Sequence, residues 1–239
     1  MGLLMWMSHP CWPSMVWQTY DYYLEPTAAY FAIKKASEPL HIQWNPATDE
    51  VEVVNYSAGT HSHLTARVQI LNMDASVAWE KETTVDSRED TTEKCIKLEF
   101  PETLSEVYFI KLWLLEDGKI LSDNFYHASR KGINYQALKQ LPEVTLDCQA
   151  KMAQDKEGNW TATVTLTNPT STPALMTRIN VVGDKDGDQF LPILYEDNYF
   201  ALLPGEQKEV SVRWKDVDTR GNSPVIRITG YNVKELSRQ

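Results

Sequence analysis

Short apolar segments separated by turn residues recur along most of the chain, and their spacing constrains the fold more than any other feature. Between residues 64 and 70 (LTARVQI), apolar side chains alternate with polar ones, which is typical of a strand with one buried face. Asp117 and Gly118 separate two such segments and predict a tight hairpin. The strands that we expect in this part of the chain are 50–56, 64–70, 77–85, 93–100, 107–116 and 119–127.

Turn signals at intervals of about ten residues are typical of an immunoglobulin-like β-sandwich, which takes roughly 100 residues. We therefore predict one sandwich over residues 38–131 and, after a polar linker at 132–141, a second over 142–239. Turns are expected around Gly158, Asn168-Pro169 and Pro204-Gly205. The strands expected in the second sandwich are 144–153, 159–168, 174–182, 199–203, 208–214 and 223–231.

The first 37 residues have a different character. Residues 1–44 hold nine of the 25 aromatic side chains. The run GLLMWM (2–7) predicts a short strand buried on both faces. Residues 25–37 predict a helix, because Pro26 suits a first helical turn and Lys34 and Lys35 complement the C-terminal end of the helix dipole. Strand, loop and helix together form one βα unit.

Composition and charge exclude several classes of protein. Hydrophobic residues make up 42% of the chain, too many for a disordered protein. The net charge is −10, and residues 38–131 hold 17 acidic against 9 basic residues, so we expect no nucleic-acid partner. No apolar run reaches the roughly 18 residues of a membrane span, and we expect no membrane segment.

The sequence offers weak metal-binding patterns, and we expect neither a metal nor a cofactor. Cys11, Cys95 and Cys148 lie far apart, which favours buried or inert thiols over a metal site or a disulfide framework. His61 and His63 have metal-compatible spacing without a third ligand, so a solvated loop is favoured. Three aspartates in DKDGD resemble the start of a calcium loop, but the downstream glutamate is absent and a hairpin turn is the better interpretation; they are Asp184, Asp186 and Asp188.

The opening segment resembles the last strand and helix of the (β/α)8 barrel of glycoside hydrolase family 2. The similar branch contains exo-β-glucosaminidases and β-mannosidase-like enzymes, in which two immunoglobulin-like domains follow the barrel. The motifs are the run around Trp6, WPS (12–14), YDYY (20–23), AYF (29–31) and KKASEPLHIQ (34–43). DNYFALLPGE (197–206) resembles a loop and strand of the last domain in the same enzymes. The resemblance implies that residues 1–37 are the end of an incomplete barrel.

This resemblance also implies what the chain does chemically. Family members cleave β-glycosides with retention, using two glutamates on earlier barrel strands. Those strands lie before residue 1, so we expect no catalytic residue here and no activity of the chain alone. In an intact barrel, Trp6 is the best candidate for substrate binding, because an indole face packs on the apolar face of a sugar; Trp12 is the second. Either could equally be a packed tryptophan of the barrel.

Two function classes remain open at the level of sequence. The first is an accessory β-sandwich region that supports the barrel of a retaining exo-β-glycosidase, with residues 3–31 contacting the rest of the barrel or a second copy. The alternative is a carbohydrate-binding module for β-linked oligosaccharides, which requires an exposed aromatic platform among Trp79, Trp113, Trp160 and Trp214. The family resemblance suggests a periplasmic or secreted bacterial protein, although the sequence carries no evident targeting signal.

Overall fold

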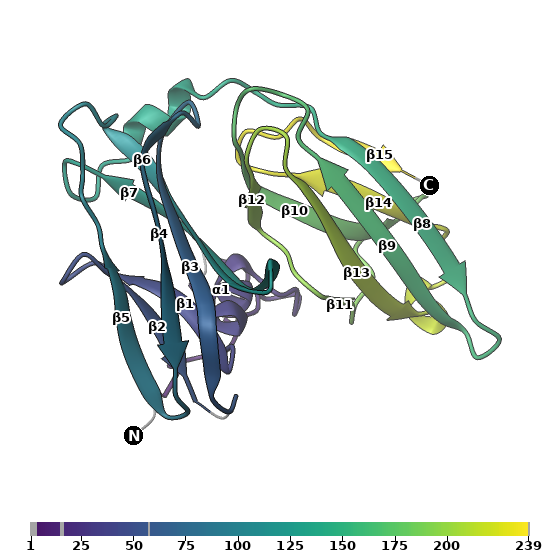
Figure 1. The fold of residues 1–239 in the computed structure, drawn as a ribbon. Coiled ribbons are helices and arrows are strands. Elements are labelled where there is room, and N and C mark those ends of the chain that lie inside the picture. The colour runs from purple at the N-terminus through teal and green to yellow at the C-terminus, as the bar shows by residue number, and fades with distance from the viewer. Residues whose placement is uncertain (1–3, 15–16, 57, 239) are drawn as a thin grey trace. The chain divides into compact units, whose positions relative to one another are not determined.

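The computed structural model describes residues 4–14, 17–56 and 58–238 (Figure 1). The chain divides into two compact units, one formed by Lys34–Leu141 and one by Met1–Ile33 together with Pro142–Gln239. We call them the first and the second sandwich unit. The boundary near residue 33 falls inside helix α1 (Ala28–Ala36), so the helix begins in the second unit and ends in the first. Both units are built from antiparallel sheets, which confirms the predicted mainly β fold with two immunoglobulin-like sandwiches.

The first sandwich unit pairs a three-stranded sheet, β1-β2-β5, with a four-stranded sheet, β4-β3-β6-β7. Its strands have these bounds: β1 Leu40–Asn45, β2 Glu50–Asn55, β3 His61–Asn72, β4 Val77–Ser87, β5 Thr91–Lys97, β6 Val107–Glu116 and β7 Lys119–Ser129. Strand β1 was not among the expected strands, although its sequence, LHIQWN, alternates apolar and polar residues. A 3-10 helix, η1 (Gln136–Gln140), lies in the segment expected as a linker.

Side-chain alternation builds the core of this unit. In β3, Leu64, Ala66, Val68 and Ile70 are fully buried, as the sequence pattern predicts. The sequence pattern of β6 predicts that Val107, Phe109 and either Lys111 or its neighbours face solvent, but all of these residues are buried. One reason lies in aromatic contacts, because the Phe109 ring stacks on Phe125 at 5.3 Å and meets His127 at 5.6 Å. Strand β6 therefore has two buried faces.

The hairpin between β6 and β7 forms where the sequence predicts it. Asp117 and Gly118 have φ angles of 49° and 77°, and Glu116 pairs directly with Lys119. Two consecutive left-handed residues define the turn type that matches the right-handed twist of antiparallel strands. Glycine is suited to the second position because it has no Cβ to clash with its own backbone.

The second sandwich unit has two four-stranded sheets, β12-β10-β14-β15 and β11-β13-β9-β8. The first of its strands are β8 Asp147–Gln154, β9 Asn159–Thr167, β10 Ala174–Gly183 and β11 Leu194–Tyr195. They are followed by β12 Phe200–Leu202, β13 Gln207–Lys215, β14 Pro224–Thr229 and β15 Leu236–Arg238, with the 3-10 helix η2 (Asp216–Thr219) after β13. Strands β11 and β15 were not expected, because two or three residues carry no detectable periodicity.

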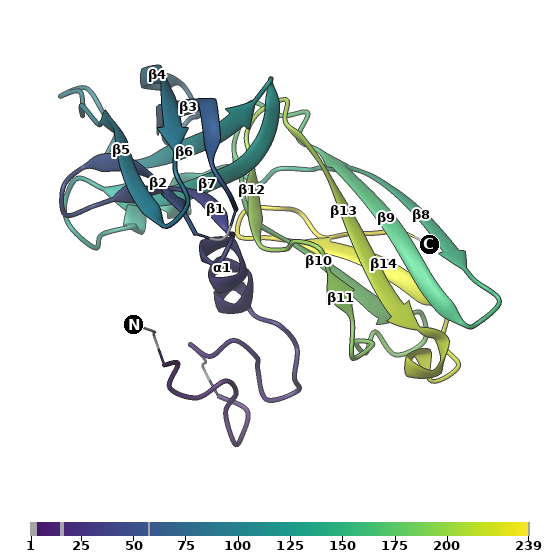
Figure 2. The same ribbon diagram turned by 60° about the horizontal axis from the view of Figure 1, so that its bottom comes forward.

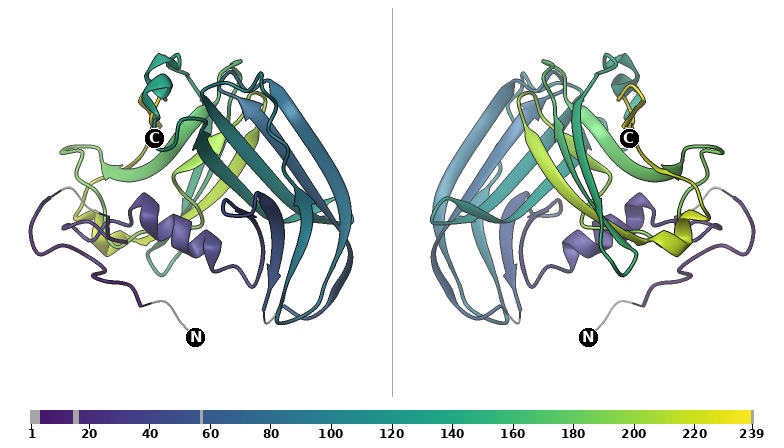
Figure 3. Two further views of the ribbon diagram at one scale, coloured as in Figure 1. Left: turned by 90° about the vertical axis from the view of Figure 1, so that its left-hand side faces the viewer. Right: turned by 90° about the vertical axis from the view of Figure 1, so that its right-hand side faces the viewer.

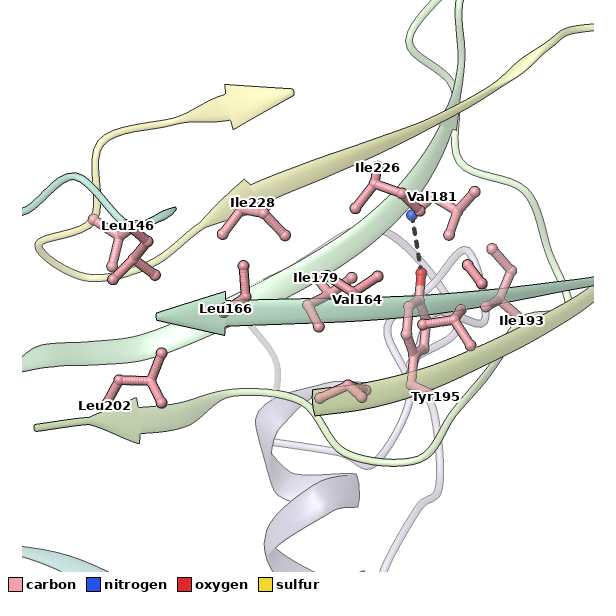
Figure 4. Close-up of a cluster of buried hydrophobic side chains, with 14 of the residues drawn as sticks. Leu146, Val164, Leu166, Ile179, Val181, Ile193, Tyr195, Leu202, Ile226 and Ile228 are labelled. Carbon is pink, nitrogen blue, oxygen red and sulfur yellow. Dashed lines mark hydrogen bonds between the residues drawn. The ribbon is translucent and has the colours of Figure 1, made fainter. Parts of the chain in front are cut away.

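The core of the second unit lies between these two sheets (Figure 4). Its aliphatic side chains come from β9, β10, β13 and β14, and Ile179, Val164, Val210 and Ile226 are fully buried. The hydroxyl of Tyr195 enters this core and accepts a hydrogen bond from the backbone N–H of Val181 at 3.1 Å. Burial raises the pKa of Tyr195, so its hydroxyl stays neutral and serves as a fixed hydrogen-bonding group.

The N-terminal residues confirm the predicted helix and correct the predicted strand (Figure 2). Helix α1 begins at Ala28, three residues later than expected, because Pro26 forms a β-bridge with Tyr20. The strand expected over 2–7 is wrong for residues 4–7, which are exposed and irregular; residues 2 and 3 lie outside the described residues. A strand needs a neighbour to satisfy its backbone groups, and residues 4–7 pair with no strand of the described chain.

Candidate functional site

The residues before α1 follow an irregular path that is fixed by specific hydrogen bonds (Figure 3). We call the described residues between 4 and 27 the N-terminal segment. The Tyr20 N–H donates to the Ser8 carbonyl at 2.9 Å, and the Thr27 N–H donates to the Thr19 carbonyl at 2.9 Å. Asp21 caps the following turn, as the sequence suggests, because its Oδ1 accepts the N–H of Tyr23 at 2.8 Å and of Glu25 at 2.9 Å. Backbone hydrogen bonds thus join separate parts of the N-terminal segment, and the Asp21 side chain fixes the turn between them.

Glu25 anchors this segment on strand β10 of the second sandwich unit. Its side chain is 10% exposed, and its Oε1 accepts hydrogen bonds from the Arg178 guanidinium and from Asn180 Nδ2, the latter at 2.9 Å. Burial lowers the pKa of Arg178, but the carboxylate of Glu25 outweighs it and holds this pKa above its ordinary value. A buried carboxylate with two donors on one strand is a strong positional lock.

Aromatic side chains extend the same attachment along α1. The rings of Tyr20 and Tyr30 lie 5.5 Å apart, Tyr30 meets Phe31 at 5.0 Å, and Phe31 meets Tyr199 at 6.0 Å. The Arg178 guanidinium lies 5.8 Å from the centre of the Tyr199 ring, so polar and aromatic contacts converge on one patch. Two sequence motifs that carry the family resemblance, AYF and DNYF, therefore meet in the second unit.

Backbone contacts explain why Tyr199 is held at this patch. The preceding residue, Asn198, is buried, and its amide clamps Ile179 by accepting the N–H at 2.7 Å and donating to the carbonyl at 2.9 Å. Tyr199 has a φ of 57°, a left-handed conformation that is uncommon outside glycine. The Asn198 clamp compensates for this strain and fixes the loop before β12.

The N-terminal segment exposes large apolar side chains. Trp6 is 81% exposed and Trp12 is 68% exposed, and both belong to this surface. Its other large members are Leu4, Met5, Met7, Trp17, Tyr22, Tyr23 and Leu24. We call this set the exposed aromatic surface. An apolar concentration of this kind marks an interaction site rather than ordinary protein surface.

The structure places Trp6 and Trp12 on the exposed aromatic surface. The residues that dock the segment, Arg178, Asn180 and Tyr199, were not among the candidates from sequence. The DNYF motif was a usable signal for Tyr199, since it resembled a loop of the family. The sequence did not single out Arg178 and Asn180 as docking residues, because polar residues that alternate along a strand ordinarily face solvent.

The weak metal-binding patterns have structural explanations. His61 lies in β3 and not in a loop, and its Nδ1 is 3.0 Å from Glu116 Oε1 while its Nε2 is 3.0 Å from the Ala58 carbonyl. His63 belongs to the same strand and has a φ of 59°, at a register shift. In DKDGD, Asp186 Oδ1 accepts the Asp188 N–H at 3.0 Å within a turn, as expected. Across the ranges described, His, Cys, Asp and Glu side chains form no group of three that could hold a metal ion.

The three cysteines are free thiols in two kinds of environment. Burial raises the pKa of Cys95 to about 11 and also raises the pKa of Cys148, so both thiols are poor nucleophiles. This agrees with the expectation of inert thiols. Cys11 is exposed and is therefore not one of the buried thiols, because it belongs to the loop that carries the exposed aromatic surface.

The four tryptophans that would have to form a glycan-binding platform do not do so. Trp160 and Trp214 are stacked with an interplanar angle of 3° at 5.8 Å, but Trp214 is 4% exposed, so the stack runs into the core. The Trp160 indole N–H is bound by Asp216 Oδ1 at 2.8 Å. Trp113 lies between two cations, Arg67 and Lys111, each 5.5 Å from its ring centre. Trp79 is half-buried and packs against the core of the first unit.

Fold and attachment together define a class of protein region: two immunoglobulin-like sandwich units, the second of which carries the N-terminal segment. The comparisons with known proteins agree. Residues 124–233 match the family model of the exo-β-D-glucosaminidase Ig-fold domain. The chain is thus related to the C-terminal region of glycoside hydrolase family 2 enzymes of the exo-β-glucosaminidase branch, with β-mannosidase relatives.

Three relatives illustrate the match. The exo-β-D-glucosaminidase of Streptomyces avermitilis is 33% identical over 98% of this chain, which covers 28% of that enzyme. The crystal structure of the exo-chitosanase from Amycolatopsis orientalis superposes with a TM-score of 0.89 at 28% identity, over 98% of this chain and 30% of that one. A mannosylglycoprotein endo-β-mannosidase from Lilium longiflorum is 23% identical over 98% of this chain, which covers 31% of it. The chain therefore spans less than a third of each relative.

Within the part of the chain that the structure describes, no helix is both long and apolar enough to cross a membrane.

Proposed function

We propose that the chain serves as the C-terminal accessory β-sandwich region of a retaining exo-β-glycosidase that acts on β-linked glucosamine or mannose. The observation that carries the proposal is a match over 98% of this chain to an exo-β-D-glucosaminidase of which it covers only 28%. On this proposal residues 1–37 belong to the catalytic barrel, 38–131 and 142–239 are the two sandwiches, and 132–141 links them. The region supports the barrel and is inactive alone.

The exposed aromatic surface supports a partner role for the N-terminal segment. Its second half is locked on β10 through Glu25, while its first half presents Trp6, Trp12 and Trp17 to solvent. Burying surface of this kind stabilises an association by roughly 25 cal/mol for each Å² removed from water. The partner that we propose is the rest of the barrel. A second copy of the chain is the competing partner, and it predicts a concentration-dependent dimer by analytical ultracentrifugation.

A chimera tests the proposal directly. The chain replaces the matching region of the Streptomyces avermitilis enzyme, and hydrolysis of p-nitrophenyl β-D-glucosaminide is measured. We expect a folded and active chimera. Failure of a soluble, folded chimera to hydrolyse the substrate would contradict the proposal.

The same chimera tests the two substrate-binding candidates. Trp6→Ala should raise KM and lower kcat/KM by about tenfold, and Trp12→Ala should do so to a smaller extent, since an indole on a sugar face contributes binding energy. Trp17→Ala is the matched control, because it lies on the same surface and is 72% exposed. If all three variants change stability alone and leave KM unchanged, the two tryptophans are packing residues of the barrel.

The carbohydrate-binding module is the alternative function. The burial of Trp214 and the pairing of Trp160 with Asp216 argue against a platform of stacked tryptophans. Tight binding of manno-oligosaccharides by the chain alone, together with an inactive chimera, would favour this alternative.

A further inference from the structure

A cleft of about 360 Å³ opens in the first sandwich unit, far along the sequence from the N-terminal segment. It lies beside the start of β6 and the end of β7, and its walls come from the turn before β2 and the loop after β5. Its volume falls at the lower end of the roughly 300–1,000 Å³ that small-molecule sites occupy. The side chains that matter for recognition are Asp49, Phe100, Glu102, Tyr108, Ser129 and Arg130.

One wall of the cleft is aromatic. The rings of Phe100 and Tyr108 meet at 5.7 Å with an interplanar angle of 61°, and Phe100 is 37% exposed while Tyr108 is buried. Phe100 therefore offers a ring to a ligand and Tyr108 supports it from behind. Burial raises the pKa of Tyr108, and the charge of Asp49 adds to this effect, so the phenol stays protonated and can donate a hydrogen bond.

The charged groups of the cleft favour a cation over an anion. One terminal nitrogen of the Arg130 guanidinium already donates to the backbone carbonyls of Glu102 at 2.7 Å and Leu104 at 3.0 Å. Arg130 thereby fixes the loop that carries Glu102. Within the described ranges, the carboxylates of Asp49 and Glu102 accept no hydrogen bond from the protein. The cleft thus offers the carboxylates of Asp49 and Glu102 as hydrogen-bond acceptors, whereas the Arg130 guanidinium already donates to the protein backbone.

We propose that this cleft binds a cationic amino sugar, with the apolar face of the ring on Phe100 and the ammonium group at Asp49 and Glu102. An aromatic wall beside hydroxyl and carboxylate groups is the chemistry that a protonated aminopyranose requires. The choice of amino sugar over another small cation rests on the proposed function, because glucosamine is the sugar of the related enzymes. The cleft then holds one glucosamine unit of a β-linked oligosaccharide.

Isothermal titration calorimetry of the full chain tests this proposal with two probes. The first probe is the β-1,4-linked dimer of D-glucosamine, and the second is its N-acetylated, uncharged counterpart. We expect the charged dimer to bind with a Kd on the order of 1 mM, which is typical of a single small sugar in an open site. The N-acetylated dimer should bind about tenfold more weakly, because it has no ammonium group to meet the carboxylates.

Two substitutions and one matched control connect the binding to the cleft. Asp49→Asn removes the charge while it keeps the left-handed backbone, since Asp49 has a φ of 52° and asparagine tolerates this conformation. Asp90→Asn is the control: it makes the same change at an exposed residue of the same unit with a φ of 58°. We expect Asp49→Asn and Phe100→Ala to weaken binding about tenfold and Asp90→Asn to leave it unchanged.

Several results would overturn the proposal. They are equal binding of the charged and the N-acetylated dimer, binding that is unaffected by Asp49→Asn and Phe100→Ala, and no heat of binding up to 50-fold above the expected Kd. The chimera experiment distinguishes these results from a failure of the proposed accessory role. A chimera that hydrolyses the aryl glucosaminide but does not bind the dimer in this cleft rejects the cleft alone. Dimer binding by the chain with an inactive chimera rejects the accessory role and leaves the cleft.

Discussion

At the scale of single residues, the attachment of the N-terminal segment depends on one buried carboxylate. Glu25 accepts hydrogen bonds from Arg178 and Asn180, both on β10. Breaking a buried ion pair leaves the remaining charge without a partner in a poorly solvated place. Arg178 keeps 26% of its side chain exposed, so water relieves part of that penalty.

Glu25→Ala should lower the free energy of unfolding of the second sandwich unit by about 2 kcal/mol, less than the full penalty for a fully buried pair. Urea denaturation measures this change. Glu235→Ala is the control, since Glu235 is exposed in the same unit, and it should shift stability by no more than about 0.5 kcal/mol. Chymotrypsin should also cleave the Glu25→Ala variant faster within the N-terminal segment. Equal cleavage rates for the two variants would show that Glu25 is not the anchor.

Two histidines of the first unit should titrate in opposite directions. A hydrogen bond with Glu116 raises the pKa of His61 above 6.5, and burial lowers the pKa of His127 below 6.5. The stability that His61 contributes is complete below its unfolded pKa and is lost as the pH rises through its raised folded pKa. For His127, stability is lost as the pH falls below 6.5, because the unfolded chain then binds a proton that the folded chain resists.

Imidazole NMR titration of the full chain measures both values. Glu116→Gln should return the pKa of His61 toward its ordinary value and leave that of His127 unchanged. If His127 moves with His61 in this variant, then the two environments are coupled and burial alone does not explain the shift of His127.

At the scale of elements, local patterns predicted most long strands and the helix. Strand β3 and helix α1 could be predicted because alternation and helix propensity are properties of neighbouring residues. Strands β11 and β15 could not, because two or three residues become a strand only through their partners. The strand expected over 2–7 failed for the same reason, since an apolar run needs a sheet to join. The docking residues Arg178 and Asn180 depend on Glu25, which lies 153 and 155 residues away in sequence, and no local pattern reports such a contact.

Substitution in the hairpin between β6 and β7 tests the turn chemistry. Gly118 has a φ of 77° and open space around the position of a Cβ, so the cost of a side chain there is backbone strain alone. Gly118→Ala should lower the stability of the first unit by about 1 kcal/mol. Gly118→Asn should cost about half as much, because asparagine adopts left-handed conformations more readily. Differential scanning calorimetry compares the two, and an equal loss would show that the φ angle is not the cause.

At the scale of the whole molecule, the chain has two complete β-sandwich cores and one segment whose apolar side chains lie in solvent. The cores explain why the sandwiches fold, and the proposed partner role depends on the exposed aromatic surface. The ion pair of Glu25 with Arg178 attaches the docked half of the segment to β10. Relatives that contain this region are three to four times longer than the matched part, which agrees with a supporting role.

Hydrolysis of p-nitrophenyl β-D-glucosaminide by the purified chain, alone and mixed with the upstream part of the Streptomyces avermitilis enzyme, tests the central claim most directly. The account predicts no turnover above the buffer blank for the chain alone. It predicts hydrolysis when both parts are present and the exposed aromatic surface is covered. Turnover by the chain alone would contradict the account, because it would require a pair of catalytic carboxylates within these 239 residues.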